Sequence, residues 1–164
     1  SLNSPVAIES SDPVFSKLTT GGYVMSRHIA EEGKYARDFV DIAERLIGTP
    51  YLWGGASRMG IDCSGLLQMS LLATGVSAPR DSDMQQEALG ATVLIPEDLD
   101  GLQRGDLVFW PGHVGIMIDG VMIVHANAHH MSVTVETLPE VAARVARNDG
   151  PAIAAIKRLT PAVV

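Results

Sequence analysis

Residues 51–70, YLWGGASRMGIDCSGLLQMS, predict the centre of the fold. They hold the only cysteine of the chain, Cys63, between a glycine-rich segment and an apolar run that ends at Ala73. Asp62 suits the N-cap of a helix that begins at Cys63, and Gly75 suits the position after its C-terminus. Backbone N–H groups and the dipole at a helix start favour a thiolate, so the pattern predicts a nucleophile. A lone cysteine is also often a small buried hydrophobic residue, and this stretch leaves both interpretations open.

The composition is that of one ordinary globular domain with a small appendage. The chain has 164 residues, of which 46% are hydrophobic and 19% charged, enough to bury a core. The formal net charge of −7 argues against nucleic acid or an anionic membrane as the main partner. No apolar run reaches the length of a membrane span.

The lone thiol and the first residues bear on the compartment. A single cysteine cannot form an internal disulfide, and a free thiol suits a reducing compartment. The first residues, SLNSPVAIESSDP, lack the basic start and apolar segment of a signal peptide. We therefore expect a cytoplasmic protein, while an exported mature form would fit the same residues.

The hydrophobic pattern predicts an α+β fold in which helices come first and an antiparallel meander follows. Residues 1–34 show short alternating pieces typical of a small β unit. Helices are expected over residues 34–47, from Cys63 onward, over 82–89 and over 138–147. Strands are expected over 106–110, 114–119, 121–126, 131–137 and 152–159, with a turn-rich connection over 95–105.

Two of the five histidines are predicted to lie side by side. Asp119 and Gly120 separate two strands where a two-residue hairpin turn is expected. In that register His113 lies within one residue of facing His125, and facing residues have Cβ atoms about 5 Å apart. Each histidine alone would be an ordinary polar residue at a strand end. As a pair near a cysteine, they suit a general base and its orienting partner.

A zinc site is the alternative that the histidines raise. His125, His129 and His130 form the pattern HxxxHH, and on a helix the first two would share a face. The residues around His125 are typical of a strand, no glutamate completes an HExxH motif, and carboxylates nearby are sparse. We therefore expect no metal, and we expect His129 and His130 to be solvated loop residues.

Five short blocks resemble a known family. YLWGG, DCSG, RGDLVFW, GHVGIM and VHA follow in the order and rough spacing of the NlpC-type cell-wall cysteine peptidases. The resemblance covers residues 35–159, and five blocks in order are far more specific than any one of them. These papain-like enzymes cleave γ-D-glutamyl–diamino-acid bonds in the stem peptides of peptidoglycan. Carried over, the resemblance implies that N-terminal helices, with the cysteine at the start of the central helix, pack on the β meander.

The resemblance also implies roles for residues of this chain. Cys63 would be the nucleophile, His113 the general base and His125 the orienting residue. Tyr51 matches the tyrosine whose hydroxyl lies beside the thiol, and Trp53 matches an aromatic residue of the pocket wall. The backbone N–H of Cys63 and the Tyr51 hydroxyl would stabilise an oxyanion. No organic cofactor is implied.

A narrower resemblance concerns the substrate. PRDSDMQ at residues 79–85 is similar to the subgroup that acts on free stem peptides rather than on intact wall. By that resemblance Asp81, Ser82, Asp62 and Ser64 would bind the L-Ala-γ-D-Glu end. A carboxylate such as Asp81 would pair with the free N-terminal ammonium, and hydroxyls would hold the D-Glu carboxylate. Asp81 and Ser82 also suit helix capping, and both interpretations stay open.

The N-terminal piece resembles part of another module. GGYVMSRHIAE at residues 21–31 is similar to the closing strands of a bacterial SH3-like domain. We therefore expect residues 1–34 to be a remnant of such a domain and residues 35–164 to be the peptidase domain. The remnant puts in doubt any substrate restriction that depends on the missing part.

The expected function is that of a cysteine endopeptidase that releases L-Ala-D-Glu from free, recycled stem peptides. An amidase or acyltransferase on the same scaffold is one alternative, because a fold does not determine its substrate. A cell-wall-binding module is another. The sequence does not decide between diaminopimelate and lysine at the scissile bond, nor does it give the oligomeric state.

Overall fold

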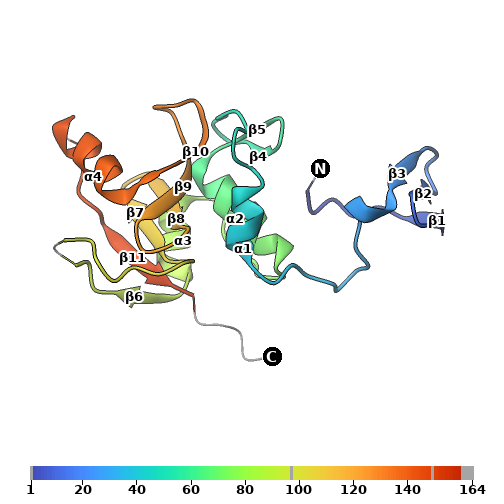
Figure 1. Ribbon diagram of the computed structural model, residues 1–164, viewed down its shortest axis with the longest axis horizontal. Helices are drawn as coiled ribbons and strands as arrows, with labels where there is room; N and C mark the ends of the chain where they lie inside the picture. Colours follow the sequence, from blue (N-terminus) through green and yellow to red (C-terminus); the bar gives the residue numbers. More distant parts are fainter. Residues whose placement is uncertain (1, 97, 149, 160–164) are drawn as a thin grey trace.

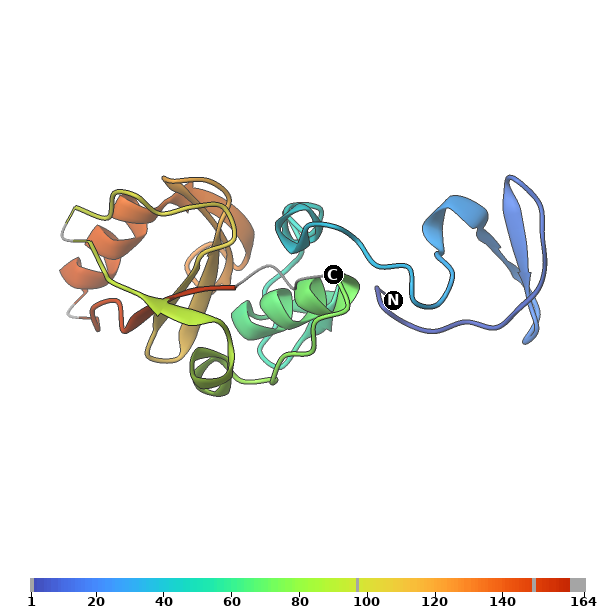
Figure 2. The ribbon, with the colours of Figure 1, turned by 90° about the horizontal axis from the view of Figure 1, so that it is seen from below.

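The computed structural model describes residues 2–96, 98–148 and 150–159 (Figure 1). The described chain is a mixed α/β fold with antiparallel sheets and few helices, as the hydrophobic pattern predicted. Figures 1 and 2 show an elongated molecule in which a small N-terminal β unit lies apart from the main body. None of the helices in the described ranges has the length and apolarity needed to cross a bilayer.

The N-terminal unit is a three-stranded antiparallel sheet. It contains β1 (Ile8–Ser11), β2 (Phe15–Leu18) and β3 (Tyr23–Met25), followed by the short 3-10 helix η1 (Ser26–His28). An extended segment connects it to the main body (Figure 2), and the side chain of Asn3 donates a hydrogen bond to the Met69 carbonyl at 2.9 Å. That this N-terminal unit is part of an SH3-like domain, with a domain boundary at residue 34, stays a prediction.

The helical half contains α1 (Phe39–Glu44), α2 (Cys63–Ala73) and α3 (Ser82–Ala88), with a two-stranded sheet of β4 (Ala56–Ser57) and β5 (Gly60–Ile61). The prediction of a helix over residues 34–47 was too long. Asp38 caps α1 by accepting from the Val40 N–H at 2.8 Å, so the helix begins at Phe39. Upstream, the Ala36 N–H donates instead to the Ala73 carbonyl at the end of α2. The predicted α2 and α3 form as expected.

The main sheet has six antiparallel strands in the order β10-β9-β8-β7-β11-β6. The strands are β6 (Ala91–Val93), β7 (Leu107–Trp110), β8 (His113–Met117), β9 (Met122–Asn127), β10 (Ser132–Thr137) and β11 (Ala155–Arg158). The predicted meander is β7 to β10, and α4 (Leu138–Arg147) carries the chain back so that β11 pairs with β7. The edge strand β6 was not predicted, because three residues are too few to show alternation.

The turn between β8 and β9 differs from the prediction. The carboxylate of Asp119 accepts hydrogen bonds from the backbone N–H groups of Val121 and Met122, at 2.8 and 2.7 Å, and the Ile118 N–H bonds to the Met122 carbonyl. The loop therefore has three residues rather than two, since an Asp side chain closes it. The register shifts by one residue relative to the prediction, so that Ile116 faces Val124.

Apolar side chains cover both faces of the main sheet. One face packs against α1 and α2, and the other against α4 and the loop before β7; Figure 2 shows the sheet between these helices. Neighbouring residues along a strand point to opposite faces, so Phe109 belongs to the α2 side and Trp110 to the α4 side. Helix α2 thereby packs against β8, the strand that begins with His113.

Candidate active site

Cys63 is the first residue of α2, and its side chain is buried. Asp62 is the N-cap, and its Oδ1 accepts from the Gly65 N–H at 2.8 Å. The backbone N–H of Val114 is close enough to the thiol to lower its pKa, so Cys63 lies near the first peptide of β8. That peptide joins Val114 to His113. The fold therefore brings the predicted nucleophile to the predicted base from a segment far away in the sequence.

The pKa of the Cys63 thiol differs from the expectation drawn from its position at a helix start. Burial raises this pKa, and the negative charge of Asp62 raises it further. Backbone N–H groups, including that of Val114, lower it, but burial outweighs them. In a site this enclosed, the free-energy cost of desolvating the thiolate exceeds the stabilisation of the thiolate by the N–H groups at the helix start. Cys63 rests as a thiol.

His113 and His125 lie side by side, as the hairpin suggested. His113 Nε2 and His125 Nδ1 are 2.9 Å apart, which is hydrogen-bonding distance. In the observed register the two residues are diagonal neighbours on one face rather than directly opposite. The ring of Trp110 lies 5.7 Å from that of His113 between centroids and helps to enclose the pair.

Both imidazoles are neutral in the resting site. Burial lowers the pKa of His113 to about 3, and electrostatic repulsion by Arg144, and by His125 whenever it is protonated, acts in the same direction. Burial also lowers the pKa of His125, although the neighbouring Glu136 opposes that shift. A neutral imidazole beside a thiol can accept its proton during attack on a carbonyl group.

The thiol opens into a groove of about 420 Å³. The groove contains most of the residues that the sequence singled out; its lining is Tyr51, Trp53, Gly54, Asp62, Cys63, Ser64, Arg80, Asp81, Ser82, Asp83 and Gly112. Burial raises the pKa of Tyr51, with contributions from Cys63 and Asp62, so its hydroxyl keeps its proton and can donate. Trp53 is 83% exposed and lies at the rim of the groove rather than in a packed wall.

Asp62 and Ser64 are already engaged within the protein. Asp62 Oδ2 accepts from the Gly54 N–H at 2.7 Å and from Arg80 Nη2 at 2.6 Å. Arg80 Nη1 donates to the Ser64 hydroxyl at 2.8 Å. Sequence reasoning missed Arg80, although it precedes the Asp-Ser pair directly. It ties the start of α2 to the loop before α3, so that the groove has a fixed wall.

Asp81 and Ser82 lie at the start of α3 beside the groove. Asp81 holds the N-cap position, but its side chain makes no cap hydrogen bond. The capping interpretation therefore does not account for its carboxylate, which lines the groove. Its role in binding stays a prediction.

Two residues behind the histidine pair were not predicted. Glu136 Oε2 lies 2.8 Å from His125 Nε2, and Arg144 binds both carboxylate oxygens of Glu136, at 2.5 and 2.9 Å. His130 is exposed, as expected, but its Nε2 also lies 3.3 Å from Glu136. The available signal was the alternation SVTVET over β10, which puts Glu136 on the same face as His125.

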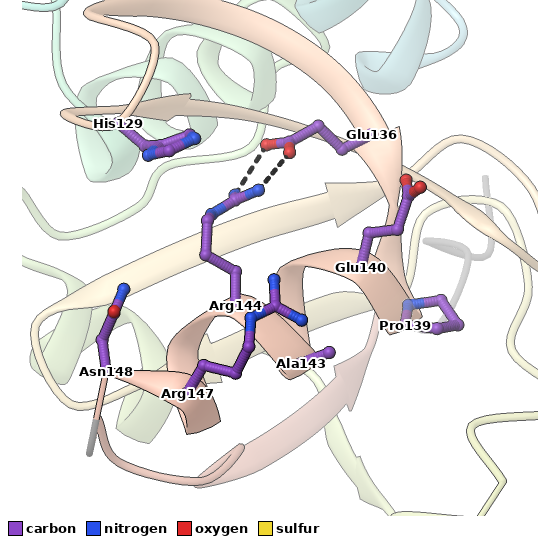
Figure 3. Close-up of a pocket in the computed structure, with 8 residues that line it drawn as sticks. All are labelled: His129, Glu136, Pro139, Glu140, Ala143, Arg144, Arg147 and Asn148. Carbon is purple, nitrogen blue, oxygen red and sulfur yellow. Dashed lines mark hydrogen bonds and ion pairs between the residues drawn. The ribbon is translucent and has the colours of Figure 1, made fainter.

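A second, charged pocket of about 750 Å³ lies on this side of the sheet and does not include the thiol. Figure 3 shows Arg144 reaching from α4 to the carboxylate of Glu136, with His129 nearby. Within the described ranges, no three His, Cys, Asp or Glu side chains are grouped so that they could hold a metal ion. The HxxxHH pattern lies on β9 and the following loop rather than on a helix.

Comparison with family models matches residues 48–146 to the NlpC/P60 family. That segment includes the cysteine helix, both histidines and Glu136, and it is more than half of the chain. The chain belongs to the NlpC/P60 family.

Curated relatives of this NlpC/P60 protein are named as peptidases. It is 37% identical over 134 residues to dipeptidyl-peptidase 6 of Lysinibacillus sphaericus, covering 76% of this chain and 48% of the relative. It is 33% identical over 120 residues to the γ-D-glutamyl-L-lysine dipeptidyl-peptidase of Bacillus subtilis, covering 68% of this chain and 39% of the relative. The chain thus spans less than half the length of these relatives.

Solved structures of NlpC/P60 proteins share the fold. A family member from Bacillus cereus superposes with a TM-score of 0.68 over 95% of this chain and 54% of its own length, at 24% identity. The NlpC/P60 domain of the peptidoglycan hydrolase SagA gives a TM-score of 0.55 at 31% identity, over 73% of this chain and 95% of that domain. The family members named here are peptidases or a peptidoglycan hydrolase, so the chain is a member of a hydrolase family.

Proposed function

We propose that this chain is a cysteine endopeptidase that hydrolyses the γ-D-glutamyl–diamino-acid bond of peptidoglycan stem peptides. The observation that carries the proposal is a buried thiol at a helix start near the first peptide of β8, the strand that begins with His113, which is hydrogen-bonded to His125 on β9. A papain-like enzyme needs this arrangement of nucleophile, base and orienting group. The name of the Bacillus subtilis relative, a γ-D-glutamyl-L-lysine dipeptidyl-peptidase, supplies the substrate class.

The first step transfers the proton of the Cys63 thiol to His113 while the sulfur attacks the γ-carbonyl carbon. The carbonyl oxygen becomes an oxyanion, which the Cys63 N–H and the Tyr51 hydroxyl would stabilise. His113 then gives its proton to the leaving amine, and a thioester remains on Cys63. Water, deprotonated by His113, attacks the thioester and releases the L-Ala-D-Glu product.

The groove suits a short charged peptide with a free amino terminus. The carboxylate of Asp81 has no helix-capping partner and lines the groove, so it can pair with an ammonium group. We infer that Asp81 anchors the L-Ala amine and that Ser82 contacts the D-Glu carboxylate. Because both oxygens of Asp62 already accept bonds from the protein, we assign Asp62 to holding the groove rather than to binding. A cytoplasmic role in peptide recycling would follow from such specificity.

The test is cleavage of L-Ala-γ-D-Glu-diaminopimelate, its lysine counterpart and their N-acetylated forms, with release of L-Ala-D-Glu followed by mass spectrometry. We expect cleavage of the free-amine peptides, and Cys63→Ala should reduce the rate at least about a thousandfold with an unchanged thermal melt. Equal cleavage of acetylated peptides would keep the peptidase and remove the amine anchor. Cleavage of none, or persistent cleavage by Cys63→Ala, would refute the proposal and favour an amidase or a wall-binding module.

A further inference from the structure

The side of His125 that faces away from His113 is fully enclosed. His125 is 1% exposed, and both of its ring nitrogens have a partner. Nδ1 lies 2.9 Å from His113 Nε2, and Nε2 lies 2.8 Å from Glu136 Oε2. The charged and titratable groups around this imidazole are therefore His113 from β8, Glu136 from β10, Arg144 from α4 and His130 from the loop before β10.

Glu136 is held as a carboxylate. Burial raises the pKa of Glu136, but hydrogen bonds from Arg144, His125 and His130 outweigh it and bring the pKa down to about 2. Arg144 binds its two oxygens with two nitrogens (Figure 3), a geometry that also fixes the orientation of the carboxylate. At neutral pH, Glu136 can only accept hydrogen bonds from its neighbours.

This acceptor determines which nitrogens carry protons, as assigned from the hydrogen-bond partners. Because Glu136 accepts, Nε2 of His125 carries the hydrogen, and Nδ1 of the neutral ring must be an acceptor. His113 therefore donates from its Nε2. The nitrogen of His113 left without a proton is Nδ1, the one available to take a proton from Cys63.

We propose that Glu136, held by Arg144, is a positioning residue that fixes the tautomers of the two histidines and supports the positive charge that His113 gains from Cys63. The proposal rests on the proposed function and deepens it. The proton leaves the Cys63 sulfur for His113 Nδ1, the S–H bond breaks and an N–H bond forms. The charge on His113 is then shared along its hydrogen bond with His125 toward the carboxylate.

A merely structural interpretation competes with this one. The ion pair between Glu136 and Arg144 joins β10 to α4, and that alone could explain its presence. The two interpretations differ in what a neutral residue of the same shape does. Glu136→Gln keeps the side-chain volume and one acceptor oxygen, which can still face His125, but it removes the negative charge.

The matched control is Glu140→Gln, the same chemical change in the same pocket. The carboxylate of Glu140 accepts a hydrogen bond from the Thr137 hydroxyl. It makes no hydrogen bond to His113 or His125 among the described residues. We expect Glu136→Gln to lower kcat by about 10- to 100-fold, by analogy with the loss of the outer hydrogen-bond partner of a metal-bound histidine, with KM within about twofold. The melting temperature should fall, because the ion pair with Arg144 is lost, but circular dichroism should show a folded protein at the assay temperature. The acidic limb of the kcat/KM profile should move to lower pH, because the imidazoles lose a neighbouring negative charge.

A second readout needs no peptide. Cys63 is the only cysteine, so alkylation of the protein by iodoacetamide reports this thiol alone. We expect Glu136→Gln to slow alkylation at neutral pH, and Glu140→Gln to leave it unchanged. If the wild type cleaves no peptide while alkylation still depends on Glu136, the proposed substrate is wrong and the positioning role stands. If Glu136→Gln has the same cleavage rates, pH profile and alkylation rate as the wild type, the inference is overturned.

A third measurement does not depend on any variant folding. Nitrogen-15 spectra of the histidine rings in the wild-type chain distinguish a proton on Nδ1 from one on Nε2. The proposal requires the Nε2–H tautomer for both His113 and His125 near neutral pH. An Nδ1–H tautomer at either residue would refute it.

Discussion

At Cys63, burial and the neighbouring N–H groups act on the thiol in opposite directions. Burial raises its pKa, while the N–H groups of Val114, Ser64 and Cys63 itself lower it. Since burial prevails and the pKa of His113 falls to about 3, the resting pair is a thiol and a neutral imidazole. Charge separation then occurs as the bond to substrate forms, where an oxyanion stabilised by N–H groups can share the cost.

At Asp81, we predict a change in specificity rather than in chemistry. Asp81→Asn should lower kcat/KM for the free-amine peptide by about 10-fold or more, because a charged hydrogen bond contributes about 1.5–3 kcal/mol. The N-acetylated peptide should be cleaved no more slowly than before. The matched control is Asp83→Asn, which also lines the groove but bonds to the Met84 N–H. Equal losses for both peptides would contradict the anchor.

The residues of the site differ in how far the sequence could predict them. Cys63 and His113 are the first residues of their elements, and His125 stands in a short apolar strand motif, so local patterns are informative for all three. Glu136 and Arg144 are recognisable only once β10 is paired with β9 and α4 is packed against the sheet. The engagement of Asp62 by Arg80 was equally hidden, because it joins the ends of two helices through a loop.

Within the elements, the glycine-rich approach to α2 has a packing reason. A Cβ on Gly65 would overlap the carbonyl oxygen of Gly55 and lie 2.9 Å from Asp62 Oδ1. The first turn of α2 therefore touches the backbone of the preceding loop. This contact holds the peptide groups around Cys63 in place.

We predict that Gly65→Ala destabilises the protein, although alanine is the better helix former by about 1 kcal/mol. Backbone cannot yield as a flexible side chain does, so overpacking should cost about 1–3 kcal/mol net. Urea unfolding followed by circular dichroism measures this. Leu72→Ala, on the exposed side of the same helix, should change stability by no more than about 0.5 kcal/mol. A stabilised Gly65→Ala would show that the loop moves freely.

Element boundaries show where local patterns mislead. The apolar stripe over residues 34–47 predicted a long helix, but the capping carboxylate of Asp38 and the pairing of Ala36 with the end of α2 shortened it. The hairpin between β8 and β9 took a three-residue loop because Asp119 bonds to two N–H groups. In both cases one side-chain carboxylate determined the boundary, which hydrophobic periodicity does not register.

For the whole molecule, we predict loss of stability on acidification from about pH 7 to about pH 4. Burial lowers the pKa of His113 from 6.5 to about 3 and also lowers that of His125. Between these pH values the unfolded chain binds more protons than the folded chain. The free energy of unfolding therefore decreases as the pH is lowered. Glu136, whose pKa falls from 4.5 to about 2, adds a loss below its unfolded pKa.

Urea unfolding across this pH range measures the effect. His113→Asn removes one buried imidazole, so its stability should depend less steeply on pH than that of the wild type. His129→Gln, a change in the exposed loop after β9, is the control. A wild-type stability that stays level between about pH 7 and about pH 4 would contradict the prediction.

The site residues fall into two groups according to their separation along the chain. His113, His125, Glu136 and Arg144 come from consecutive elements, and their contacts close short loops. Bringing Cys63 to the start of β8 closes a loop on the order of fifty residues, which costs more entropy. During folding, the histidine relay can therefore assemble before the nucleophile reaches it. A chain that stops short of this last contact has its thiol away from His113, so peptide cleavage by Cys63 requires the completed fold.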